Sequence, residues 1–109
     1  MEHTFLAMWC SEGLECIIDV TAHEQKQIWS SLKGEEVKAL PNLNAMMLRA
    51  RYNSQRRYEI YLVSASEGIT ERDLKEMFNN DPQYAADLIR DRGKMLYSDR
   101  ANGKKEIII

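Results

Sequence analysis

A chain of 109 residues suits one domain, because two halves would each be too small to bury a core without cross-links. Its composition, 44% hydrophobic and 29% charged, excludes a chain too polar to fold, and its net charge of −2 argues against a general nucleic-acid coat. The chain has no apolar run of the ~20 residues that a membrane crossing needs, and no basic secretory start. We therefore expect a single cytoplasmic domain over residues 1–109, with no membrane partner.

Two β-strands are predicted at the start of the chain. Residues 3–10 are apolar on both alternating faces, which is typical of a central strand covered on both sides. Residues 14–20 alternate between apolar and polar side chains, so one face of this strand is apolar. Cys10 and Cys16 are the only cysteines. We interpret them as two free structural thiols, although a wide loop between the strands would permit a disulfide.

A capping box begins the first predicted helix. The hydroxyl of Thr21 can accept a hydrogen bond from the amide of Glu24, and the Glu24 side chain can reach back to the start of the helix. Ile28 and Trp29 lie on its apolar face, and Gly34 is a natural end. This face is expected to pack on the sheet.

A basic β-hairpin is predicted in the middle of the chain. Residues 35–44 form a connector, because Pro41 disfavours helical geometry at Leu40 and the asparagines favour turns. In residues 46–63, two apolar alternating runs flank a polar turn, which is the pattern of a hairpin. No residue between Pro41 and Tyr58 is acidic. Four arginines there carry +4 of a chain whose net charge is −2, which leaves −6 for the remainder.

We interpret the outer face and the turn of this hairpin as a binding surface. Arginine binds carboxylates and phosphates with paired hydrogen bonds, and tyrosine stacks on bases or packs at protein interfaces. The expected partner-binding residues are Arg49, Arg51, Arg56, Arg57, Tyr52, Tyr58 and Tyr61. The residues expected to point inward are Met46, Leu48, Ala50, Ile60 and Leu62. Glu59 is expected to pair across the strands with Arg49 or Arg51.

Two more helices and a terminal hairpin complete the prediction. Thr70 caps one helix, and Asp81, followed by proline, caps the next. The pair Asn102–Gly103 favours a two-residue turn between residues 95–98 and residues 106–109. The three isoleucines at the end would close the sheet of the same chain or pair with another chain.

The sequence carries no catalytic or metal-binding pattern. All five glycines lie at the boundaries of predicted elements, so none is left for a phosphate-binding loop. The two histidines and two cysteines lack the spacing of metal ligands. A nucleophilic pair of Cys16 or Cys10 with His23 would need an exposed thiol with a lowered pKa, whereas Cys16 lies on an apolar strand face. We expect no catalytic residue, no metal and no cofactor.

The predicted fold is α+β, in the order β-β-α-β-β-α-α-β-β, with one antiparallel sheet built from hairpins and helices packed mainly on one face. The pattern favours a small, non-enzymatic binding or adaptor protein that uses its hairpin for protein–protein interaction or self-assembly. A nucleic-acid-binding module using the same surface is the second hypothesis. A small enzyme with an unrecognised active site is the third.

Overall fold

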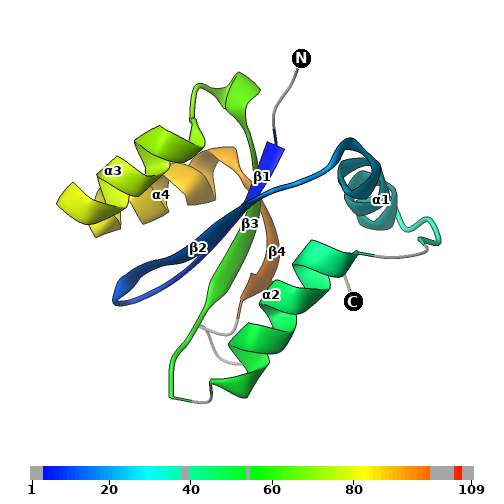
Figure 1. Cartoon of the computed structure of the whole chain (residues 1–109), viewed down its shortest axis with the longest axis horizontal. Coiled ribbons are helices and arrows are strands. Elements are labelled where there is room, and N and C mark those ends of the chain that lie inside the picture. Colours follow the sequence, from blue (N-terminus) through cyan, green and yellow to red (C-terminus); the bar gives the residue numbers. More distant parts are fainter. Residues whose placement is uncertain (1–3, 38–39, 54, 99–104, 107–109) are drawn as a thin grey trace.

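An antiparallel sheet with the strand order β2-β1-β3-β4-β5 forms the centre of the fold (Figure 1). The computed structural model describes residues 4–37, 40–53, 55–98 and 105–106. The class is α+β, as predicted, but the order of elements differs from the predicted one. In chain order they are β1 (Thr4–Cys10), β2 (Gly13–Asp19), α1 (Ala22–Leu32), α2 (Pro41–Tyr52), β3 (Glu59–Ser64), the short 3-10 helix η1 (Ala65–Glu67), α3 (Glu71–Asn80), α4 (Pro82–Arg92), β4 (Lys94–Ser98) and β5 (Lys105–Glu106).

Strand β1 is central, which confirms the prediction from its two apolar faces. It pairs antiparallel with β2 on one side and β3 on the other, and all seven of its residues are buried. Phe5, Ala7 and Trp9 enter one hydrophobic cluster, while Leu6 and Met8 enter a second. The alternation of a strand therefore supplies both layers of the core from one segment.

Helices lie on both faces of the sheet (Figure 1). Helices α3 and α4 pack against the face that carries Trp9, and α1 and α2 pack against the face that carries Met8. The expectation that helices pack mainly on one face is wrong, because β1 and β3 are apolar on both sides and need two covers. On α1, Ile28 is fully buried, whereas Trp29 is only partly buried at the margin of its cluster.

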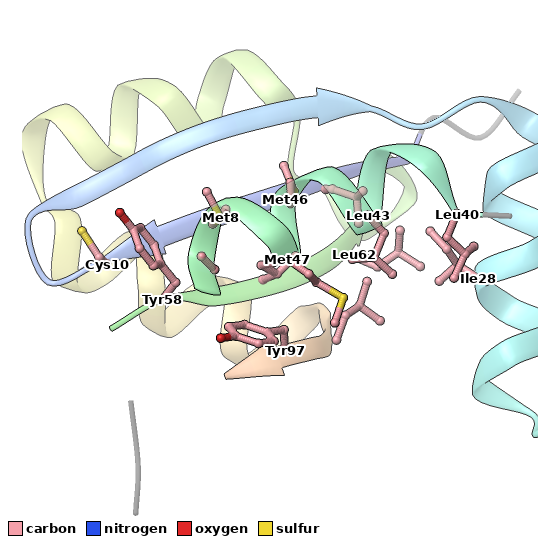
Figure 2. Close-up of a cluster of buried hydrophobic side chains, with 14 residues drawn as sticks. Met8, Cys10, Ile28, Leu40, Leu43, Met46, Met47, Tyr58, Leu62 and Tyr97 are labelled. Carbon is pink, nitrogen blue, oxygen red and sulfur yellow. The ribbon is translucent and has the colours of Figure 1, made fainter. Parts of the chain in front are cut away.

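Helix α2 replaces the first arm of the predicted hairpin. The prediction over residues 46–63 is wrong there, because residues 41–52 are helical and Pro41 occupies the first turn. The buried residues of α2 follow a helical spacing of three and four: Leu43, Met46, Met47 and Ala50. Figure 2 shows Leu43, Met46 and Met47 in one cluster with side chains of the sheet. Leu48, expected to point inward, is exposed. The second arm is the strand β3, which pairs with β1 and β4.

The predicted helix starts are confirmed, but the expected return of the Glu24 side chain to the start of α1 is wrong, because its carboxylate accepts from the Asn42 amide instead. The hydroxyl of Thr21 accepts a hydrogen bond from the Glu24 amide (3.2 Å), and Thr70 accepts from Asp73 (3.1 Å). The Asp81 carboxylate accepts from the amide of Tyr84 (3.1 Å). The predicted turn Asn102–Gly103 and the terminal isoleucines lie outside the described residues.

Candidate interaction surface on helix α2

The outward face of α2 carries large apolar side chains beside arginines. Leu48 and Tyr52 lie one turn apart and are 52% and 81% exposed. Arg49 and Arg51 flank them, and both lie on the exposed side of the helix. We call these four residues the α2 surface. This composition is unusual for a solvated helix face. Such a face usually carries polar side chains, and apolar residues of this size usually point toward the core.

Ion pairs join the end of α2 to the hairpin formed by β1 and β2. The Arg56 guanidinium lies 2.8 Å from a carboxylate oxygen of Glu12 and 3.7 Å from one of Glu15. Arg49 lies 3.7 Å from Glu15. The Glu12 charge raises the pKa of Arg56. The positive charges of Arg49 and Arg56 are thus partly neutralised within the protein, and Arg57 lies exposed next to Arg56.

The structure separates the three tyrosines that were expected to share one surface. Tyr52 is exposed, but Tyr58 and Tyr61 are only 1% and 6% exposed, so their predicted exposure is wrong. The Asn53 side chain donates a hydrogen bond to the Tyr58 hydroxyl (3.2 Å). Tyr61 stacks on Trp9 with ring centroids 5.0 Å apart, under α3 and α4. Tyr61 is buried because β3 is an inner strand covered on each face, and Tyr58, which directly precedes β3, is buried in the cluster beneath α1 and α2.

Glu59 pairs with α4, and the expected pairing with Arg49 or Arg51 is wrong. Its Oε2 atom accepts a hydrogen bond from Arg90 Nη2 at 2.7 Å. A second nitrogen of Arg90 donates to Asp87 (3.0 Å), which extends the ion pair to the helix surface. Burial raises the pKa of the adjacent Tyr61, with a further contribution from the Glu59 charge. This pairing tethers α4 to β3, and it lies on the opposite face of the sheet from α2.

The described residues bring together neither an activated thiol nor a group of metal ligands. Cys10 is a buried free thiol, and Cys16 is a partly buried one whose pKa is raised by burial. A raised pKa keeps a thiol protonated and weakens it as a nucleophile. Within the described residues, no three His, Cys, Asp or Glu side chains are grouped so as to hold a metal ion. None of the helices in this part combines the length and apolar character needed to cross a membrane.

Two of the open clefts in the described part of the chain lie at the sides of the sheet. One, of about 530 Å³, lies between the edge strand β2 and α3 and is lined by residues 12–17 together with Lys75, Phe78 and Asn79. The other, of about 430 Å³, lies between α1 and the start of β4. The lining of the first cleft includes the ionisable side chains of Glu12, Glu15 and Lys75, and that of the second includes Lys33 and Lys94.

Comparison of the chain with protein-family models, with curated proteins and with solved structures finds no match. The case for a site therefore rests on the geometry of the chain itself. The feature that sequence reasoning missed is the exposure of Leu48, and the helical spacing of Leu43, Met46, Met47 and Ala50 is the signal that could have revealed it.

Proposed function

We propose that this chain is a binding or adaptor protein that docks an acidic segment of another protein on the α2 surface. The observation that carries the proposal is the pair Leu48 and Tyr52, exposed one turn apart between arginines. Tyrosine and arginine are enriched among the residues that dominate protein interfaces, and an adjacent leucine adds apolar area. The absence of acidic residues from Pro41 to Tyr58 favours a negatively charged partner.

Three observations favour a protein over a nucleic acid. Arg49 and Arg56 already pair with carboxylates, which reduces the charge available for phosphates. Helices cover both faces of the sheet, so its strands offer no open platform on which bases could stack. Of the three tyrosines considered for stacking, Tyr52 alone is exposed.

The same charge pattern disfavours self-association through α2. A symmetric contact places the same surface of two copies face to face. Arginines of one copy would then oppose arginines of the other, with no acidic residue between positions 41 and 58 to pair with them. We therefore propose that the partner is a different protein.

The proposal includes a cytoplasmic location, because a reducing compartment suits the free thiols of Cys10 and Cys16.

The test begins with purification from the native host, before and after nuclease treatment. A partner that survives nuclease is then measured by calorimetry against the parent chain and against a Leu48→Ser/Tyr52→Ala variant. We expect the variant to bind at least about tenfold more weakly, because it loses the aromatic and apolar contacts. Tyr84→Ala is the control, since Tyr84 is also exposed (57%) but lies on α4. Equal affinity of the parent and the α2 variant would refute the proposal, and loss of the partner after nuclease treatment would favour nucleic acid.

A further inference from the structure

Strand β2 is an edge of the sheet, and no strand among the described residues pairs with its outer side. Figure 1 views the molecule down its shortest axis, and β2 lies on the broad face nearest the viewer, between α3 and α2. The seven residues of β2 include no lysine and no proline, which commonly protect an edge strand from pairing with another chain. In the described part of the chain, this edge is therefore open to a further strand.

One hydrogen bond shows which backbone groups of β2 point outward. The Val20 amide donates to the Thr4 carbonyl at 3.1 Å, and this contact continues the register of the pairing between β1 and β2. In an antiparallel pair, hydrogen-bonded residues alternate with residues whose N–H and C=O groups point away from the partner strand. Ile17, opposite Ala7, is of the second kind. Its backbone groups therefore point to the open edge.

The residues around Ile17 form a short uncharged run that is symmetric about it. Cys16 and Ile18 pack against the cluster beneath α1 and α2, and Ile17 packs against the cluster beneath α3 and α4. Glu15 and Asp19 bound the run, and Glu15 is the extra residue at the irregularity in the pairing of β1 with β2. Regular pairing on the outer side is therefore limited to the segment that starts at Cys16.

We propose that two copies of this chain pair their β2 strands antiparallel, about a two-fold axis at Ile17. Ile17 of one copy lies opposite Ile17 of the other, with two backbone hydrogen bonds between them. Cys16 lies opposite Ile18, so every directly opposed pair in the run is apolar. The Ile17 side chain of each copy is directed to the other copy's cleft of about 530 Å³, which Ile17 and Phe78 help to line.

The acidic residues that flank the run do not face one another across this contact. In this register, Glu15 lies level with Asp19 of the second copy. The Glu15 side chain extends toward Arg49 of α2, 3.7 Å away, whereas Asp19 lies opposite Phe5 and so shares the face covered by α3 and α4. The two carboxylates therefore lie on opposite faces of the sheet.

The shape of the molecule favours a second copy as the occupant of this edge. The molecule measures 38 × 35 × 20 Å, and β2 lies on its broad face. That face is larger than the ~800 Å² that each partner of a standard interface buries. The two-fold axis uses the β2 edges of both copies, so the dimer is closed, and both α2 helices lie on the same side of one continuous sheet. The pairing does not involve Leu48 or Tyr52, so it does not rest on the proposed function.

Analytical ultracentrifugation of the full chain over about a hundredfold range of concentration tests the dimer. We expect the sedimenting mass to rise from one chain to two. Ile17→Pro removes the N–H that points away from β1, so it should stay at the mass of one chain while its circular dichroism matches that of the parent. Ile17→Ala keeps that N–H and is the matched control, which should still dimerise, although more weakly. A parent that sediments as one chain throughout would overturn the proposal, and so would Ile17→Pro dimerising as the parent does.

Cross-linking tests the register without the proline variant. Ile18→Cys places a thiol opposite the native Cys16 of the second copy, in a pair without direct hydrogen bonds whose Cα atoms are about 4.5 Å apart. Mild oxidation should therefore join this variant into a dimer on a non-reducing gel. Val20→Cys lies on the same face but roughly 8 Å from that Cys16, too far for a disulfide, and is the control. Equal cross-linking of the two variants would indicate random collision, and cross-linking of Val20→Cys alone would indicate another register. Either result would overturn the proposal.

Discussion

The carboxylate of Glu24 in α1 accepts a hydrogen bond from the backbone amide of Asn42 in the first turn of α2, at 2.9 Å. Leu40 precedes α2 and has no side-chain acceptor of its own to cap the helix. Glu24 is 2% exposed, so the cap is supplied across the core by another helix. Glu24 therefore takes part in two helix starts. Its backbone amide donates to Thr21 at the start of α1, and its side chain caps α2.

Replacing Glu24 with alanine should lower the free energy of unfolding by about 2 kcal/mol, because a helix amide loses a hydrogen bond to a charged group. Glu24→Gln retains an oxygen acceptor without the charge and should cost about half as much. Urea denaturation measures both. The exposed Glu36 follows α1 in the chain, and Glu36→Ala is the control. A Glu24→Ala protein as stable as its parent would show that the contact contributes nothing.

The ion pair between Glu59 and Arg90 should be important for stability. Arg90→Leu leaves the buried Glu59 carboxylate without this partner, and we expect a loss on the order of 2 kcal/mol, reduced from a fully buried pair because Arg90 is about one-third exposed. Adding Glu59→Gln should restore part of that loss. A double-mutant cycle in urea measures the coupling, and Arg72→Leu, which breaks the exposed pair with Glu76, is the control.

Alkaline pH should destabilise the fold through Tyr61. Burial raises the pKa of its phenol above the ordinary 10.0, so the folded state keeps the proton after the unfolded chain has released it. The stabilising contribution is therefore complete below the unfolded pKa and is lost as the pH rises through the folded one. Tyr61→Phe preserves the ring against Trp9 and removes this titration. Its stability should fall less between about pH 9 and pH 11 than that of the parent. Identical curves would contradict the assignment.

The arginines near α2 should affect partner binding more than folding. We expect the melting temperature to change little when all four are replaced by glutamine: Arg49, Arg51, Arg56 and Arg57. The ion pairs of Arg49 and Arg56 with Glu12 and Glu15 are partly exposed and contribute little to stability. The association rate should fall, and its dependence on salt between about 50 and 500 mM should become shallower. Stopped-flow measurements with the identified partner test this, and an unchanged rate would exclude electrostatic steering by these residues.

The misassigned α2 shows where sequence reasoning reached its limit. β1 and the starts of the helices were predictable, because their patterns are local: two apolar faces, or a capping side chain three residues before its amide. In α2, Leu48 alternates with Met46 and Ala50, which reproduces the period of a strand. An apolar residue on the exposed face of α2, Leu48, is therefore both a candidate for binding and the reason that the helix resembled a strand in the sequence.

The pairing of Glu59 was beyond local patterns for a different reason. Arg90 lies 31 residues further along the chain, and only the packing of α4 on β3 brings the two side chains together. The expected pairing of Glu59 with Arg49 or Arg51 assumed that these arginines lie on a strand, whereas they lie on helix α2. Likewise, the burial of Tyr61 follows from the central place of β3 in the sheet, and that of Tyr58 from its packing in the cluster beneath α1 and α2.

Helix α2 is held at both ends by carboxylates from other elements. Glu24 of α1 binds the first turn of α2. At the other end, Glu15 pairs with Arg49 of α2, and Glu12 and Glu15 pair with Arg56 just after the helix. A helix anchored in this way keeps its outward side chains in place before any encounter, so a ligand need not pay the entropy of ordering the backbone beneath them. Recognition on α2 should therefore proceed as rigid docking, in a single kinetic phase whose rate rises linearly with ligand concentration.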